Sequence, residues 1–234
     1  MPLPAATAKT PYLDRQETNP PSRRLFQPAL SGLAFLLLCV LILLGATHTL
    51  DWGGQKLLAR LSSPWLDVTG FVLTLLGEAP ITGALAVLLA VRGWRRSREQ
   101  GLGPLLLFVG VGIEVFLKSV LPHPGPPVEF ARPLHVPEFL RLIGSLLQVT
   151  ARPVWAGLAP PYAFPSGHML RATFLVAVAS THRPQWRVVG YVLVLSMGVT
   201  RVYCNEHWPS DVVGGALLGW ALARVALALE QESR

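Results

Sequence analysis

The sequence predicts an all-α fold, a transmembrane bundle of six helical spans with short interfacial helices on its outer face. Of its 234 residues, 51% are hydrophobic and only 14% are charged, whereas soluble domains usually carry about 25% charged residues. Six apolar stretches separated by polar segments could cross the roughly 30 Å hydrocarbon core of a bilayer. The composition excludes general disorder, and two cysteines are too few for a disulfide-rich secreted scaffold. The sequence therefore indicates an integral membrane protein.

The chain divides into a tail and one membrane domain. Residues 1–28 contain six prolines and four basic residues without apolar periodicity, which predicts a disordered cytoplasmic tail. Residues 29–230 are predicted to form the membrane domain. A cleaved signal peptide is the alternative interpretation of the first apolar stretch, but that stretch is long and no small-x-small cleavage site closes it. The six stretches lie at residues 25–50, 68–91, 102–121, 167–180, 188–203 and 211–229.

Basic residues set the predicted orientation. They cluster in the tail, in residues 92–98, and at Arg183 and Arg187, segments that six spans place on one side of the membrane. Because basic loops stay in the cytoplasm, we expect both termini there, in a multi-pass protein of the cell membrane. Topology then explains the net charge of +7, and no nucleic-acid partner is expected. The sequence does not fix the oligomeric state.

The remaining loops face outward in this topology. The longest, residues 122–165, carries Phe139, Ile143, Leu146 and Leu147 at helical spacing. That pattern predicts a short helix lying in the membrane interface. Residues 52–65 are predicted to form a second interfacial segment.

Three groups of polar residues lie where the outward loops meet the spans. Lys118 ends the third span, and Pro165-Ser166-Gly167-His168 opens the fourth. The third group, which connects the fifth and sixth spans, contains Arg201, His207 and Asp211. Because all three groups fall at the same outer face, we expect them to form one site.

These motifs resemble those of the type 2 phosphatidic acid phosphatase family, membrane lipid phosphatases related to the vanadium haloperoxidases. The family carries Lys-x6-Arg-Pro, then Pro-Ser-Gly-His, then Ser-Arg-x5-His-x3-Asp. The second motif is complete here, and the third has Thr200 in place of the leading serine. The first motif has Gly125 where the family has arginine. The resemblance covers residues 111–229, about half of the chain.

The resemblance implies a role for each of the catalytic residues. His207 is the nucleophile that forms a phosphohistidine, and Asp211 holds its other ring nitrogen and fixes the tautomer. His168 protonates the leaving alkoxide and later activates water. The cations of Lys118 and Arg201, and the donors of Ser166 and the Gly167 N–H at a helix N-terminus, suit a phosphate dianion.

The missing arginine leaves one phosphate donor unidentified. Arg171 lies one turn after His168, at a depth where a charge is costly and by default suggests a function. We expect it either to supply the positive charge that Gly125 cannot or to form a structural pair with Glu114 or Glu206. Two weaker candidates for the donor are Arg132 and His123. Lys118 can itself pair with Glu114, and Glu78 is assigned no catalytic role.

The expected function is hydrolysis of a membrane lipid phosphate at the outer face, with the lipid entering sideways from the bilayer. Candidate substrates are, in order, undecaprenyl pyrophosphate, phosphatidylglycerol phosphate and phosphatidic acid. No Cys/His cluster has metal-ligand spacing, so we expect a metal-independent enzyme without a cofactor. The main alternative is a non-catalytic lipid-phosphate-binding protein that keeps the fold. A vanadate haloperoxidase and a transporter fit the sequence less well.

Overall fold

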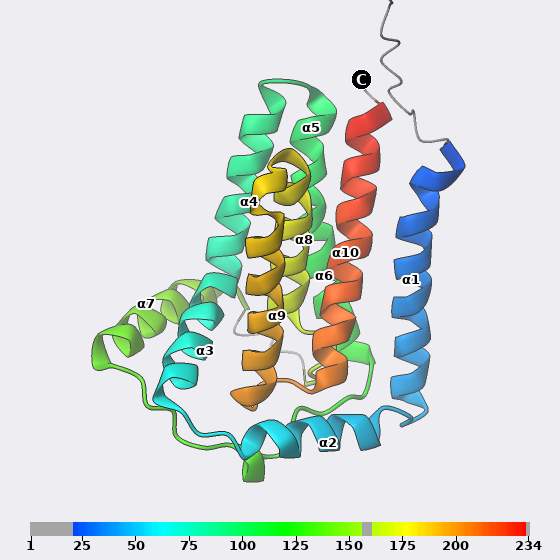
Figure 1. Ribbon diagram of the computed structural model, residues 1–234. Helices are drawn as coiled ribbons and strands as arrows, with labels where there is room; N and C mark the ends of the chain where they lie inside the picture. Colours follow the sequence, from blue (N-terminus) through cyan, green and yellow to red (C-terminus); the bar gives the residue numbers. More distant parts are fainter. Residues whose placement is uncertain (1–20, 156–160, 233–234) are drawn as a thin grey trace, which may run out of the picture.

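The computed structural model describes residues 21–155 and 161–232, and every regular element within them is a helix (Figure 1). The long helices run side by side as a bundle, and α1 begins at the end of the bundle where α10 finishes (Figure 1). The α-helices are α1 Pro21–Leu43, α2 His48–Ala59, α3 Pro64–Gly77, α4 Ala79–Trp94, α5 Arg98–Leu102, α6 Leu106–Val120, α7 Glu138–Trp155, α8 Gly167–His182, α9 Arg187–Tyr203 and α10 Pro209–Glu232. Three 3-10 turns join them, at Gly103–Leu105, Val128–Phe130 and Pro184–Trp186. The predicted all-helical class is confirmed.

Each predicted apolar stretch contains a helix or a bent pair of helices. In the described part of the chain, two helical segments are long and apolar enough to cross a membrane, Arg98–Val120 and Pro209–Glu230. The number rises to four if α1 with α2, and α3 with α4, each count as one span. Helices α8 and α9 have 16 and 17 residues. Six spans, and their orientation, therefore remain predictions.

The first helix differs from its predicted limits at both ends. It begins at Pro21, before the predicted domain boundary at residue 28, and proline is well tolerated in a first helical turn. It ends at Leu43, and Gly45 adopts a φ of +68° that favours glycine. Helix α2 then turns by 91° and lies across one end of the bundle, over most of the segment predicted to be interfacial (Figure 1). Residues 1–20 lie outside the described residues, so the disordered tail stays a prediction.

The second predicted span is broken at Glu78, which is extended, with φ −60° and ψ 146°. Helices α3 and α4 meet there at a bend of 50°. Pro80 follows in the first turn of α4, and its ring is incompatible with a helix that continues from Leu76. The break leaves the Gly77 carbonyl free to accept hydrogen bonds from a side chain.

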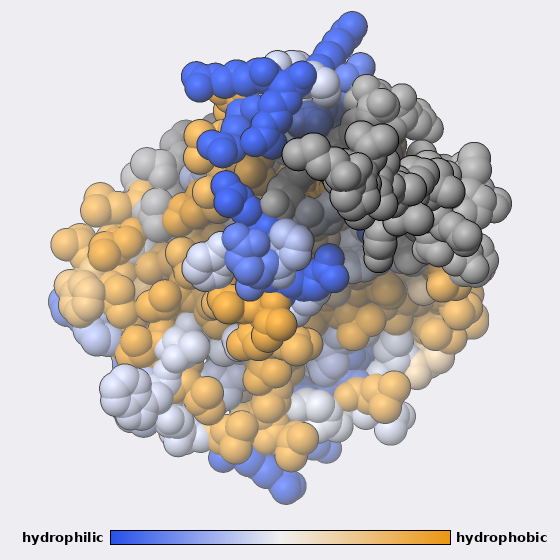
Figure 2. Space-filling view, turned by 45° about the horizontal axis from the view of Figure 1, so that its top comes forward, coloured by the Kyte–Doolittle hydropathy of each residue, from blue (hydrophilic) through white to orange (hydrophobic). Residues whose placement is uncertain are grey.

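Apolar side chains cover the flanks of the bundle, and polar ones gather at the end near α4 and α5 (Figure 2). Leu36, Leu88 and Leu195 are each more than 60% exposed, as suits contact with lipid. On α7, Phe139 and Ile143 are exposed on one face, in agreement with the predicted interfacial helix. The exposed polar residues of the α4–α5 end include Arg92, Arg95 and Arg96.

Helices α8 and α10 pack so closely that their backbones are in direct contact at two glycines of α10. A Cβ on Gly215 would overlap the carbonyl oxygen of Ser166, and a Cβ on Gly219 would overlap that of Leu170. These glycines are four residues apart, so they lie on one face of α10. The close approach fixes the start of α8 against the start of α10, where two of the predicted motifs lie.

Candidate active site

The Pro-Ser-Gly-His motif forms the N-terminus of α8. Gly167 is the first residue of the helix, and Ser166 precedes it with an extended backbone. The Ser166 N–H donates to the carbonyl oxygen of Asp211 at 2.9 Å, which joins this motif to the first turn of α10. The Ser166 side chain is fully buried, and its Oγ has no hydrogen-bond partner within the described residues. The hydroxyl is therefore a free donor at a helix N-terminus, a favourable place for an anion.

The nucleophile predicted from the motif lies in the short connection between α9 and α10. His207 Nδ1 is 3.2 Å from Oδ2 of Asp211, and the Trp208 N–H donates to the same oxygen at 2.9 Å. Burial lowers the pKa of His207 well below its ordinary value, and the positive charge of Arg201 lowers it further. A neutral imidazole whose Nδ1–H donates to a carboxylate keeps a lone pair on Nε2.

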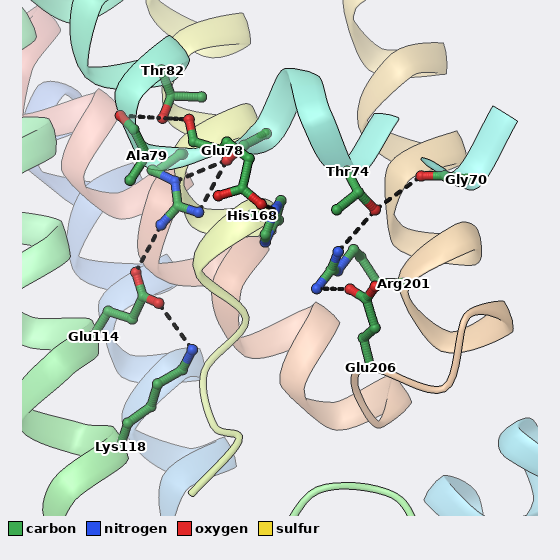
Figure 3. A network of polar contacts seen from close by, with 12 residues as sticks. Gly70, Thr74, Glu78, Ala79, Thr82, Glu114, Lys118, His168, Arg201 and Glu206 are labelled. Carbon is green, nitrogen blue, oxygen red and sulfur yellow. Dashed lines mark hydrogen bonds and ion pairs between the residues drawn. The ribbon is translucent and has the colours of Figure 1, made fainter. Parts of the chain in front are cut away.

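Lys118 and Arg171 share one carboxylate, that of Glu114. Figure 3 shows the contact of Glu114 with Lys118. Lys118 Nζ lies 3.0 Å from Oε1, and Arg171 Nη1 lies 3.2 Å from Oε2. The remaining donors of Arg171, Nε and Nη2, reach the Gly77 carbonyl at 3.1 and 3.0 Å. The carboxylate also lies against Gly167, where any Cβ would overlap it. Glu114 therefore neutralises two cations beside the α8 N-terminus.

Arg201 and His168 face acidic side chains in the same region (Figure 3). Arg201 forms an ion pair with Glu206 and donates from Nη1 to Thr74 Oγ1 at 3.0 Å. His168 Nε2 lies 3.8 Å from Glu78 Oε1 and has no hydrogen-bond partner in the described residues. Each cation of the site thus has a carboxylate that an anionic substrate could replace.

The predicted site residues come together. The charges of Lys118, His168, Arg171 and Arg201 all act on His207, although they come from three different helices. Among residues 21–155 and 161–232, no three His, Cys, Asp or Glu side chains are grouped so that they could hold a metal ion. The concentration of positive charge is suited to binding phosphate directly.

The candidates for the missing arginine have different surroundings. Arg171 is engaged by Glu114 and Gly77, the structural alternative to a phosphate-binding role. Arg132 forms an ion pair at 2.5 Å with the buried carboxylate of Asp67 and stacks on Tyr203, which anchors the outer loop. His123 lies beside Asp211, with 3.4 Å between Nε2 and Oδ1. Gly125 itself is open, since among the described residues a Cβ there would meet only Ala163, at 3.9 Å.

Two residues that contact this region were not predicted from the sequence, the buried side chains of Asp51 and Gln55 on α2. Gln55 Nε2 donates to the Val202 carbonyl at 3.1 Å and to Asn205 Oδ1 at 2.8 Å, and thereby holds the chain just before His207. Asp51 accepts from the backbone N–H and the hydroxyl of Ser210, at 2.9 and 2.8 Å. Their spacing of four residues puts both on one face of the helix, a signal that was present in the sequence.

Comparison with known proteins agrees with this geometry. The chain is 26% identical over 210 residues to phosphatidylglycerophosphatase B of Bacillus subtilis, covering 85% of this chain and 92% of that protein. It is 31% identical over 70 residues to an undecaprenyl-diphosphatase of Sulfolobus acidocaldarius, covering 30% and 34%. The fold matches the crystal structure of a transmembrane PAP2-type phosphatidylglycerolphosphate phosphatase from B. subtilis, with a TM-score of 0.69 and 22% identity, over 89% of this chain and 98% of that one.

The family model of the PAP2 superfamily matches residues 102–234, more than half of the chain. The matched region contains every predicted catalytic and phosphate-binding residue, from Lys118 to Asp211. With two histidines, an aspartate and several cations gathered at the ends of apolar helices, the chain belongs to the PAP2 superfamily and is a membrane lipid phosphatase.

Proposed function

We propose that this phosphatase cleaves a phosphate or pyrophosphate lipid through a phosphohistidine formed on His207. The 3.2 Å contact between His207 Nδ1 and Asp211 Oδ2 carries this assignment. With the Nδ1–H donating to the carboxylate, the Nε2 lone pair attacks the terminal phosphorus. The bond from this phosphorus to the leaving oxygen breaks, and that oxygen departs with the lipid alkoxide of a monoester or with the lipid phosphate of a pyrophosphate. Water then cleaves the phosphorus–nitrogen bond and releases inorganic phosphate.

The phosphate is bound by the cations around this histidine. Lys118 and Arg201 are paired with Glu114 and Glu206 in the absence of substrate. A phosphate dianion competes well for both, because it carries more charge than a carboxylate and accepts several hydrogen bonds. The free hydroxyl of Ser166 and the backbone N–H of Gly167 add donors at the start of α8.

His168 is the proton donor and acceptor in this scheme. Its Nε2 has no hydrogen-bond partner among the described side chains and lies among the same cations. In its protonated form it gives a proton to the lipid alkoxide as the ester bond breaks. In its neutral form it then takes a proton from the attacking water.

Phosphatidylglycerol phosphate is the first substrate to test, because the relative with that activity in its name aligns with 85% of this chain. Undecaprenyl pyrophosphate follows from the shorter match to an undecaprenyl-diphosphatase, and phosphatidic acid completes the set. We propose that the lipid enters from the bilayer and that phosphate leaves at the outer face.

The test is phosphate release by detergent-purified protein from these three lipids, with a soluble phosphate ester as a control. The variant His207→Ala should lose turnover, and His168→Ala should be slower by about 10²–10⁴-fold. Activity should survive EDTA and be inhibited by orthovanadate, which can accept a fifth bond from His207. Rates near those of the unaltered protein in either histidine variant would refute the mechanism.

A non-catalytic lipid-phosphate-binding protein is the second candidate, because Gly125 replaces a phosphate-binding arginine. That function predicts saturable binding of the same lipids with no phosphate released. A non-catalytic binding protein would also bind these lipids with the same affinity before and after the substitution His207→Ala. Phosphate release above the His207→Ala background excludes it.

A further inference from the structure

His123 lies on the side of Asp211 that faces away from the nucleophile. Its Nε2 is 3.4 Å from Oδ1 of Asp211, a buried oxygen that forms no hydrogen bond within the described residues. The opposite oxygen, Oδ2, is the one that faces His207. The carboxylate of Asp211 is therefore flanked by one imidazole on each side.

The surroundings of His123 Nε2 determine which ring nitrogen carries a proton. Besides Asp211 Oδ1, Nε2 faces the hydroxyl of Ser210 at 3.2 Å and Asp51 Oδ2 at 3.9 Å. The Ser210 hydroxyl proton is donated to Asp51, so its oxygen is left as an acceptor. Three acceptors thus surround Nε2. The tautomer with its proton on Nε2 is favoured, because the other tautomer would place a nitrogen lone pair against these acceptors.

Asp51 and Asp211 are two buried carboxylates that lie within 4 Å of the same nitrogen. Their mutual repulsion would favour protonation of one of them, and a donor placed between them opposes that effect. Asp51 is further held by the backbone N–H of Ser210, so it cannot move away from the start of α10. Burial lowers the pKa of His123, and the Asp51 charge offsets part of this shift.

His123 lines a cavity of about 360 Å³ in the elbow between α1 and α2, together with His48, Asp51 and Trp52. Gly125, where the family has its arginine, also lines this cavity, whereas Lys118, Arg171, Arg201 and His207 do not. The ring also packs edge-on against Phe164, with 6.3 Å between ring centroids, which restricts its orientation.

We propose, on the basis of the proposed function, that His123 is a positioning residue for the catalytic pair. Its Nε2–H holds Oδ1 of Asp211, so that Oδ2 stays an ionised acceptor for Nδ1–H of His207. His207 then presents the Nε2 lone pair as the nucleophile. Asp51 and Ser210 complete the arrangement by fixing the position of the His123 donor.

Three substitutions separate this role from simple packing. His123→Phe keeps a ring against Phe164 but removes the donor. His123→Gln can place an amide N–H near the original Nε2, whereas the shorter side chain of His123→Asn cannot reach Asp211. We expect kcat to fall about tenfold or more in the Phe and Asn variants, with KM nearly unchanged. The Gln variant should recover most of kcat. If His123→Phe fails to fold, the difference in kcat between His123→Gln and His123→Asn still tests the positioning role.

A second measurement does not depend on turnover. In protein labelled with ¹⁵N-histidine, the His207 signals, assigned by their absence in His207→Ala, report which ring nitrogen carries the proton. We expect Nδ1–H in the unaltered protein and in His123→Gln, and a mixture of tautomers in His123→Asn. If the tautomer changes as expected but no lipid is hydrolysed, the proposed function fails and the positioning role stands. Unchanged kcat and an unchanged tautomer in both His123→Phe and His123→Asn would overturn the positioning role.

Discussion

Arg171 and Glu114 form a buried ion pair, with 3.2 Å between Nη1 and Oε2. Both side chains are less than 10% exposed, and the guanidinium also caps the broken end of α3 through the Gly77 carbonyl. Arg171 thus connects α8 with α6 and with the bend between α3 and α4. Its charge is satisfied by the protein itself, which makes stability the first property that its removal should affect.

Arg171→Ala should lower the free energy of unfolding by about 3 kcal/mol, because a buried carboxylate loses its partner. Lys118 continues to neutralise Glu114, so the loss should be near the lower end of the range for broken buried pairs. Combining Arg171→Met with Glu114→Gln should restore part of the stability, since the Glu114 charge is removed but Lys118, whose side chain is 17% exposed, then lacks its carboxylate partner. Thermal unfolding in detergent measures the change, with exposed Arg187→Ala as the matched control. Unchanged stability with a large loss of kcat/KM would instead assign Arg171 to phosphate binding.

Gly125→Arg should fold normally and lower KM for a lipid phosphate. A Cβ at this position meets only Ala163, at 3.9 Å, so the outer loop can accept the side chain. One added charge-assisted contact to phosphate is worth about 1.5–3 kcal/mol, and we expect a decrease in KM of about tenfold. Gly125→Met, similar in length but neutral, should leave KM unchanged. An equal KM in the Arg and Met variants would mean that residue 125 does not reach the phosphate.

Asp211→Asn should reduce kcat by about 10²–10⁴-fold and leave KM nearly unchanged. The amide can donate to His207 Nδ1, which favours the tautomer with its proton on Nε2 and so removes the nucleophilic lone pair. The Trp208 N–H donates to the same oxygen that faces Nδ1, so an amide nitrogen placed there also costs this hydrogen bond. The backbone carbonyl of residue 211 still accepts from the Ser166 N–H, so the contact between α8 and α10 should be retained. Steady-state kinetics on the lipid substrate, beside a thermal unfolding curve, provide the test. A kcat equal to that of the unaltered protein would contradict the assigned role of Asp211.

Cys204 should react slowly with maleimides at neutral pH. Burial raises the pKa of its thiol to about 11, and the nearby Glu206 carboxylate adds to the shift, so little thiolate is present at pH 7.5. Labelling should accelerate as the pH approaches 10, and Glu206→Gln should accelerate it at fixed pH. The rate is measured in the Cys39→Ala background by mass spectrometry, with Leu142→Cys on exposed α7 as a fast-reacting control. Rapid labelling of Cys204 at pH 7 would contradict the prediction.

Several features of the fold could be predicted because they are local in the sequence. Long apolar stretches that lie in a bilayer form helices, because every backbone N–H and C=O must be paired within the segment, so their positions can be predicted along the chain. The contact between His207 and Asp211 could also be predicted, since the two residues are four positions apart where the chain enters α10. The amphipathic pattern of α7 was likewise sufficient to predict a helix with one apolar face.

Features that depend on distant partners could not be predicted. The sequence was compatible with two roles for Arg171, phosphate binding and a structural ion pair. It could not distinguish them, because the contacts of Arg171 lie 57 and 94 residues away in the chain. Asp51 and Gln55 have their partners about 150 residues away. The bend at Glu78 was missed although Pro80 signals it, because hydropathy averaged over a long stretch does not respond to one proline.

The glycine contacts between α8 and α10 make the distance between the two catalytic histidines a property of the backbone. At Gly215 and Gly219 the backbones of the two helices come close together, and the Ser166–Asp211 hydrogen bond joins the helix ends. His168 in the first turn of α8 and His207, two residues before α10 begins, are therefore held near each other by this pair of helices. A side chain at either glycine would force the helices apart and so should move His168 away from His207.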